Sequence, residues 1–377
     1  MSLSNNFLSH FDGVIDPRQN THNKRHLLSD ILVLTILAVL CGAQTWTGVE
    51  EFGEAKEEWL KTFLKLPHGI PSHDTLGDLY SRLSPLQLQE GFLSWIQSIV
   101  QVGSGDIIPI DGKTLRRSYD SAGSRGAIHM VSAWSSRNGV VLGQLKTEEK
   151  SNEITAIPEL LGMLDIKGSI VTIDAMGCQK DIAKKIIEQE GDYVLALKGN
   201  QSSLYDDVSL YMDSIIDEQL KKIPLETCTT LDKGHGRIED RKYWITESID
   251  WLPQKKLWAG LNSIGVVEST RHIGDKVTKE RRYYISSLPM NAKRFAEAVR
   301  THWQVENQLH WCLDVSFNED QCRVRKDHAP ENFSVIRHIA LNMLKMEKTS
   351  KVGLTIKQSK AGWDNRYLTK ILEASGF

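Results

Sequence analysis

Cysteine is scarce in this chain, and the few cysteines present stand far apart. There are five: Cys41, Cys178, Cys228, Cys312 and Cys322. Their number is odd and no CxxC motif occurs, which argues against a disulfide framework and against a structural zinc site. We therefore expect reduced thiols and a cytoplasmic protein.

Long hydrophobic runs are also missing. The most apolar stretch, 31–41, is too short to cross a bilayer and follows Asp30, so it reads as a buried helix. The N-terminal sequence MSLSNNFLSHFDG has no basic segment followed by an apolar one, as a secretory leader would have. These features predict a protein with no membrane association.

An overall excess of one charge is absent too, since the formal net charge is −2. The charge is unevenly distributed, however. Residues 151–220 contain 5 Lys or Arg against 13 Asp or Glu, whereas residues 221–300 contain 16 against 10 and residues 320–377 contain 11 against 6. An acidic region suited to cations is thus followed by basic regions suited to an anionic polymer.

With 377 residues, the chain is long enough for two or three domains. Residues 1–100 read as a small helical domain, with helices expected at 27–40, 50–63, 73–83 and 92–100. Ser72 or Asp74 is a plausible cap for the third helix. This arrangement is compatible with a DNA-binding module and equally with ligand-free helix packing.

Short apolar strands begin after residue 101. We expect strands at 107–110, 129–134, 140–145, 169–173 and 193–197, with helices at 153–164, 179–190 and 202–220. Antiparallel strands followed by strands that alternate with helices predict a mixed α/β sheet. This order is that of an RNase H-like domain, so we assign residues 101–220 to the first part of such a core.

The pattern changes again in the last part of the chain. Residues 221–290 alternate polar with apolar residues, which predicts an antiparallel β insertion. Residues 291–350 return to helices, first a long amphipathic helix through 300–320 and then a helix over 330–348. Residues 351–377 read as a loosely patterned basic tail.

Three acidic residues stand out within this framework. Asp111 and Asp174 each end an apolar strand, in PIDGKTLR and TIDAMGCQ, and Glu306 lies on the helix RTHWQVENQLHWCLDVSFNED. Glu306 shares a helix face with His302 and His310 at four-residue spacing. On this helix alone, Glu306 could be a core-edge glutamate paired with a histidine. Three carboxylates together instead form an all-oxygen set, which Mg²⁺ or Mn²⁺ prefers.

Two divalent ions held by such a set support in-line phosphoryl transfer. Phosphodiester substrates would also need nearby cations to hold the backbone. The candidates are Lys113, Arg116, Arg117, Arg323, Arg325 and Lys326.

The three acidic motifs resemble the catalytic triad of DDE transposases from bacterial insertion sequences. The similarity is greatest to the branch of H-repeat-associated proteins linked to Rhs elements, and it covers nearly the whole chain. The motifs occur in the order of that family, 63 and 132 residues apart. The second interval is long enough to include the β insertion that this superfamily carries.

The resemblance implies an enzyme in which Asp111, Asp174 and Glu306 hold Mg²⁺ or Mn²⁺. Water would cleave the end of the element, and the freed 3′ hydroxyl would attack target DNA. The implied partner is double-stranded DNA, bound by at least a homodimer in the nucleoid. The family's basic element in the insertion corresponds here to His235, Arg237 and Arg241, although a solvated hairpin face explains these residues equally well.

The chain departs from the wider family at positions that are expected to contact the DNA end. Many relatives carry Tyr, Arg and Lys seven before, four before and seven after the catalytic Glu, whereas this chain has Val299, His302 and Leu313. The closer branch has the HWxxEN…HW pattern found here. We expect Arg300 and His302 to supply the phosphate contact instead.

Trp303 and Trp311 lie on either side of Glu306 in sequence. We expect both in the core, with stacking on an extruded base as the alternative.

Three other functions compete with transposition. A zinc hydrolase using His302, Glu306 and His310 is disfavoured, because the spacing is HxxxExxxH and not HExxH. A transposase remnant that binds DNA without moving it would keep the same residues. An RNase H-like nuclease that cuts without joining would also use the triad, but it would not need the N-terminal domain or the insertion.

Overall fold

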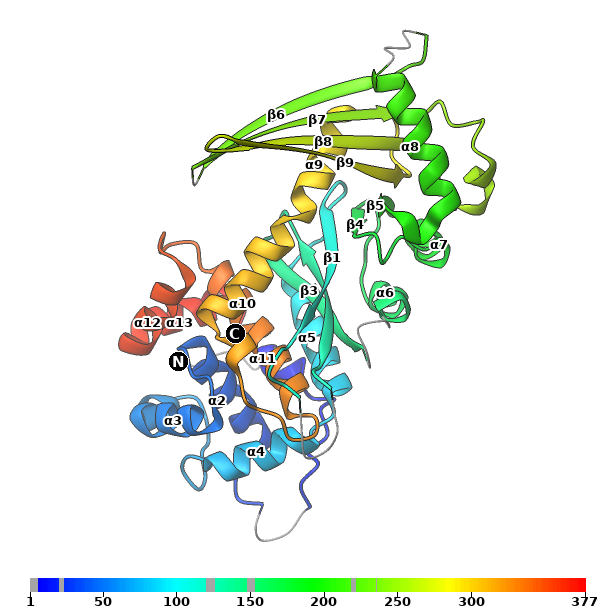
Figure 1. Ribbon diagram of the computed structural model, residues 1–377. Coiled ribbons are helices and arrows are strands. Elements are labelled where there is room, and N and C mark those ends of the chain that lie inside the picture. The colour runs from blue at the N-terminus through cyan, green and yellow to red at the C-terminus, as the bar shows by residue number, and fades with distance from the viewer. Residues whose placement is uncertain (1–5, 20–23, 120–125, 148–152, 218–221, 235) are drawn as a thin grey trace.

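The computed structural model describes residues 6–19, 24–119, 126–147, 153–217, 222–234 and 236–377. Within these residues the chain builds a nine-stranded mixed sheet with helices packed around it (Figure 1). This confirms the predicted mixed α/β class. The strands are β1 (Ile107–Thr114), β2 (His129–Ser135), β3 (Val140–Thr147), β4 (Ile170–Ile173), β5 (Asp192–Leu197), β6 (Glu226–Gly234), β7 (Arg237–Thr246), β8 (Ser263–Ile273) and β9 (Lys276–Ser286).

The strand order is β3-β2-β1-β4-β5-β9-β8-β7-β6. The β1, β4 and β5 strands are parallel, and every other neighbouring pair is antiparallel. We predicted an antiparallel β insertion in residues 221–290. This region forms four antiparallel strands, which extend the first sheet because β9 pairs with β5 from Val194 and Ser286 to Leu197 and Tyr283.

Four helices described in the N-terminal region overlap the predicted ones, and a further short helix, Asn6–Ser9, was not predicted. Ser72 accepts a hydrogen bond from the Thr75 amide and caps the third of the predicted helices, as expected. The next helix begins at Pro85, seven residues earlier than predicted, because Ser84 caps it and proline suits the first helical position. These helices are α1 (Asn6–Ser9), α2 (Leu28–Leu40), α3 (Trp46–Leu60), α4 (His73–Arg82) and α5 (Pro85–Ile99).

The remaining helices alternate with the strands or follow them. They are α6 (Glu153–Gly162), α7 (Lys180–Glu188), α8 (Ser202–Asp217), α9 (Ala292–His302), α10 (Trp311–Ser316), α11 (Ala329–Met346), α12 (Leu354–Trp363) and α13 (Asn365–Ala374). The predicted basic tail is therefore wrong for most of 351–377. Leu368, Ile371 and Leu372 are fully buried, and this apolar face packs α13 against α11.

Helix α9 crosses the sheet and contacts both of its halves. It packs on β1, β4 and β5 and also on β6 and β7, as Figure 1 shows. Phe295 at the centre of this contact is fully buried, and it sits where a Cβ on Gly265 would lie 2.5 Å from its ring. Glycine at this position therefore allows the helix to approach the sheet closely.

Helix α11 joins the N-terminal helices to the sheet. Nearly all of its residues are buried, including polar ones. Asn342 accepts a hydrogen bond from the Val141 amide and donates one to the Val141 carbonyl, each at 2.8 Å. Asn332 donates to the carbonyls of Tyr80 and Leu83. The helix thereby protects the edge strand β3 and fixes α4 to the core.

A largely buried cluster of charges links β1 to α10 and to the segment after it. Lys113 Nζ lies 2.5 Å from Asp314 Oδ1 and 2.7 Å from Glu319 Oε2. Arg337 of α11 approaches the other Glu319 oxygen to 3.6 Å. Burial alone would raise the pKa of Glu319, but Lys113 and Arg337 outweigh it and hold that pKa at about 2.

None of the helices in the described part of the chain combines the length and the apolar character needed to span a bilayer.

Replacing Lys113 by methionine should lower the free energy of unfolding by about 3–5 kcal/mol, because Glu319 would lose its nearest cation while staying buried. Urea denaturation of the purified variant measures the change. Lys167→Met is the matched control, since Lys167 pairs with Glu190 at the surface, with both side chains 67% exposed. The control should change stability by less than about 1 kcal/mol. Equal effects of the two substitutions would contradict the buried role of Lys113.

Candidate active site

Two of the predicted acidic residues lie on or directly after neighbouring parallel strands. Ile110 of β1 and Ile173 of β4 form the last pair of their ladder. Asp174 directly follows β4, whereas β1 continues through Asp111 to Thr114 in its antiparallel pairing with β2. Because the carboxyl ends of parallel strands meet at one edge, the two carboxylates lie near each other. Asp174 follows a strand as predicted, but the prediction that Asp111 ends a strand is wrong, because β1 continues past it in its pairing with β2.

Glu306 comes from the segment that follows α9. The predicted continuous helix over 300–320 is interrupted, since α9 ends at His302 and a π-helical turn spans Glu306–His310 before α10. Helix α10 ends at Ser316, and Asn318 adopts a left-handed conformation with φ 51°. Wide turns of this kind commonly occur at functional sites.

Asp111, Asp174 and Glu306 line one cavity of about 670 Å³. Among the residues that the structure describes, no three His, Cys, Asp or Glu side chains are close enough to hold a metal ion together. The three carboxylates thus line one cavity but are not arranged as a complete set of metal ligands. Their all-oxygen chemistry nevertheless fits a hard divalent cation.

The two aspartates are held by backbone amides. Asp111 Oδ1 accepts from the Gly112 amide at 2.9 Å. Asp174 Oδ1 accepts from the amides of Met176 and Gly177 at 3.0 and 3.3 Å. These bonds orient the carboxylates without neutralising their charge.

Asp111 is strongly perturbed by its surroundings. Burial is the largest cause and raises its pKa to about 7, against the opposing Gly112 hydrogen bond. The negative charges of Asp174, Glu153 and Glu306 raise it further. A carboxylate that is costly to ionise alone is one that a cation would stabilise.

The two histidines near Glu306 occupy the same side of the segment. His302 Nδ1 lies 3.1 Å from Thr172 Oγ1 on β4, and burial lowers its pKa. His310 Nδ1 lies 3.6 Å from Asp111 Oδ2. Burial, with Lys113 nearby, lowers the pKa of His310 to about 4. His302 therefore contacts the sheet, and its position next to β4 leaves little surface for the predicted phosphate contact.

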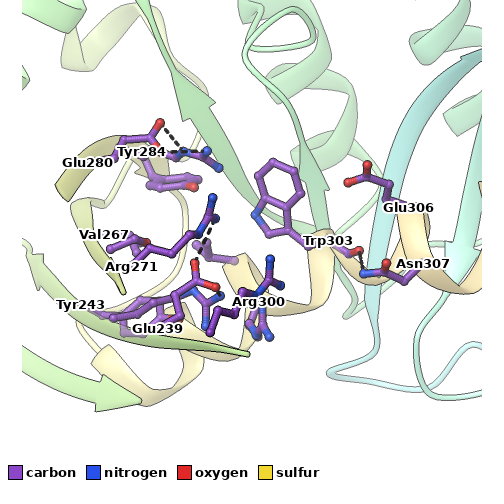
Figure 2. A pocket seen from close by; sticks show the side chains of 15 residues that line it. Glu239, Tyr243, Val267, Arg271, Glu280, Tyr284, Arg300, Trp303, Glu306 and Asn307 are labelled. Atoms are coloured by element: carbon purple, nitrogen blue, oxygen red, sulfur yellow. Dashed lines mark hydrogen bonds and ion pairs between the residues drawn. The ribbon is translucent and has the colours of Figure 1, made fainter. Parts of the chain in front are cut away.

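Trp303 and Trp311 are not core residues, contrary to our expectation. Their exposed fractions are 40% and 60%. Figure 2 shows Trp303 standing between Glu306 and the strands that carry Arg271 and Tyr284. Leu309 and Leu313 of the same helical segment are buried, and the Arg282 guanidinium lies 4.9 Å from the centroid of the Trp303 ring.

A second cavity, of about 290 Å³, lies on the other side of Trp303 and is rich in arginine. Arg241 is 8% exposed and pairs with Asp232 and Glu239, so little of it is available to a ligand. Arg300 also pairs with Asp232, at 2.9 Å, but remains half-exposed. Arg237 is exposed, and His235 lies outside the described residues.

The basic residues predicted near the triad differ in exposure. Lys113 is not available for DNA, because its side chain is 11% exposed and held in the buried ion cluster. Arg116 is 79% exposed, with its Nε 3.2 Å from Asp320. Arg325 donates to the Arg117 carbonyl and lies 4.6 Å above the Tyr119 ring.

Two further predicted cations, Arg323 and Lys326, are exposed. Lys326 lies 3.8 Å from Asp78 of α4.

The sequence did not point to three residues at the cavity with Asp111: His129, Glu153 and Asp314. His129 begins a strand and Glu153 begins a helix, and nothing in their local sequence marks them. They come together only because β2 and α6 meet beside β1. Their position could not be found without the tertiary arrangement.

Comparison with known families matches residues 103–343 to the transposase DDE domain and residues 8–96 to the DDE_Tnp_1-associated region. The chain is 46% identical to the "H repeat-associated putative transposase YhhI" of Escherichia coli K12, with 98% of each chain covered. It is 43% identical to the "Putative transposase YncI" of Escherichia coli O157:H7, covering 97% of this chain and 94% of that one.

Among solved structures, a piggyBac transposase synaptic complex with hairpin DNA has a TM-score of 0.45 and 13% identity, covering 95% of this chain and 74% of that one. This level of agreement does not establish a common fold. The domain match, by contrast, spans more than half of the chain, and the two relatives align almost from end to end. This chain therefore belongs to the DDE transposase family and is similar to its H repeat-associated members.

Proposed function

We propose that this protein is a divalent-metal-dependent enzyme that cleaves DNA strands at the ends of a mobile element and transfers them into target DNA. The observation that carries the proposal is the shared cavity of Asp111, Asp174 and Glu306. Family membership supports the same activity.

The three carboxylates would hold Mg²⁺ or Mn²⁺. When bound, a pair of such ions activates the attacking oxygen and stabilises the leaving oxygen of a phosphodiester. The raised pKa of Asp111 supports a cationic ligand, because a nearby positive charge would restore its ionised form. Glu306 is exposed and lines the same cavity as the two aspartates.

DNA binding rests on the exposed cations around the cavity. Arg116, Arg323 and Lys326 lie on the surface near α4 and the segment after α10, and Arg237 and Arg300 lie beside Trp303. Cations in such positions neutralise backbone phosphates and release counterions. The exposed indoles of Trp303 and Trp311 offer stacking surfaces for bases next to Glu306.

The division of the chain follows from this activity. We propose that 101–220 and 291–350 form an RNase H-like catalytic core, and that 221–290 is its β insertion. The helical region 1–100 would recognise the element ends, and a homodimer would hold two ends on double-stranded DNA.

Asp174→Asn and Glu306→Gln should each reduce metal-dependent strand cleavage by about 10³-fold or more, since each removes a carboxylate that supports several kcal/mol of transition-state stabilisation. The measurement is nicking of labelled duplexes taken from either flank of the gene, with Mg²⁺ and with Mn²⁺. Glu188→Gln, an exposed carboxylate of α7, is the control and should cleave normally.

A triad variant that cuts at the wild-type rate would remove that residue from the site. Cleavage without joining to a target duplex would identify a nuclease. Binding of DNA without any cleavage by the wild type would identify a non-catalytic relative.

Asp111 should make stability depend on pH in the metal-free protein. Its pKa is about 7 in the folded state against 3.8 ordinarily, so the folded state binds the proton more tightly between about pH 4 and pH 7. Stability therefore falls as pH rises through this window. We expect Asp111→Asn to be more stable than wild type at about pH 8, with the difference shrinking toward about pH 4. Urea unfolding in EDTA tests this, and a constant difference at all pH values would refute it.

Arg323→Ala should weaken DNA binding and make the dependence of log K on log [NaCl] shallower by about 0.9, the contribution of one phosphate contact. Fluorescence anisotropy with a labelled duplex at several salt concentrations measures the slope. Lys167→Ala, which removes an exposed cation near α6, is the control. A slope equal to that of the control would exclude Arg323 from the DNA interface.

A further inference from the structure

A buried histidine–glutamate pair borders the cavity that contains Asp111. His129 Nε2 donates to Glu153 Oε1 at 2.5 Å, and the side chains are 4% and 9% exposed. The other ring nitrogen of His129, Nδ1, lies 2.9 Å from Thr114 Oγ1. Strands β1 and β2 therefore fix the histidine, and the histidine fixes the carboxylate of α6.

The residue after Asp111 leaves room for this pair. A Cβ built on Gly112 would overlap His129 Nε2 and would lie 2.5 Å from Glu153 Oε1. The requirement at this position is for space, because any side chain would push the pair away. The pair therefore packs against β1 at Gly112, the residue after Asp111, and both of its members line the cavity of the three carboxylates.

The charge of Glu153 is less well compensated than that of the other buried glutamate nearby. Glu319 has both Lys113 and Arg337 beside it. Among the described ion pairs, Glu153 is partnered by His129 and by no lysine or arginine. Buried Glu153 and part-buried Asp111 line one cavity. Carboxylates that share such a space are stabilised when a cation lies between them.

We propose that Glu153 is a fourth carboxylate of the divalent-ion site, and that His129 and Thr114 are positioning residues that orient it. This inference rests on the metal dependence proposed above. Carboxylates around a metal need hydrogen-bonded partners to hold their orientation, and the loss of such a partner typically costs about 10–100-fold in metal affinity. The Thr114–His129–Glu153 chain supplies that support from rigid strands.

The test uses the full-length protein and makes two measurements. Calorimetry gives the affinity for Mn²⁺, and thermal unfolding gives the rise in the midpoint temperature that Mn²⁺ produces. Glu153→Gln keeps the shape and can still hydrogen-bond His129, so it removes the charge alone. We expect it to bind Mn²⁺ about 10–100-fold more weakly and to lose most of the Mn²⁺-induced rise. His129→Gln should show a smaller loss of the same kind.

Glu331→Gln is the matched control. Glu331 is a largely buried carboxylate that pairs with Lys146 at 3.5 Å and lies outside the cavity. It should bind Mn²⁺ as the wild type does. A merely structural role for Glu153 would lower the metal-free midpoint but leave the Mn²⁺-induced rise unchanged, and that result would overturn the inference.

The outcomes separate this inference from the proposed enzyme. Loss of Mn²⁺ binding in Asp174→Asn with normal binding in Glu153→Gln overturns the role of Glu153 alone. Weakened binding in Glu153→Gln, with a wild type that cleaves no DNA, supports the fourth carboxylate and removes the proposed activity. Absence of Mn²⁺ binding by the wild type overturns both.

Discussion

The ion cluster centred on Lys113 holds the candidate site together. Lys113 is two residues beyond Asp111 on β1, and its partners Asp314 and Glu319 follow the segment that carries Glu306. The contact therefore ties the strand with the first carboxylate to the segment with the third. Because Glu319 also meets Arg337, the same interaction anchors both to α11 and through it to the N-terminal helices.

Two kinds of carboxylate occur in this region. Glu319 has Lys113 and Arg337 beside it and keeps its charge at low pH, whereas part-buried Asp111 lies near other carboxylates and resists ionisation. The fold thus uses its internal lysine and arginine for structure and leaves Asp111 without a lysine or arginine beside it among the described ion pairs. In an ordinary buried ion network every carboxylate has a cationic partner, as Glu319 does. A carboxylate without such a partner in the described part of the chain, like Asp111, is instead typical of a site that binds a ligand.

The sequence predicted those features that depend on local periodicity. The buried helix α2 and the position of Asp174 directly after β4 follow from apolar runs and their ends, whereas β1 continues past Asp111. Features that depend on tertiary packing could not be predicted from the sequence. Lys113 looks like a surface cation until α10 and α11 cover it, and Glu153 gains significance only where α6 meets β2. Helices α12 and α13 were also missed, because most of their residues are polar and only a narrow face of each helix is apolar.

The path of α9 has a mechanical consequence. This helix is packed on both β1–β4–β5 and β6–β7, and it leads within four residues to Glu306. Any rotation of the outer four strands against the inner ones would swing the helix end, and with it Glu306, relative to the two aspartates. The orientation of the outer strands and the position of Glu306 are thus mechanically coupled through α9, so a load on the outer strands would also change the spacing of the three carboxylates.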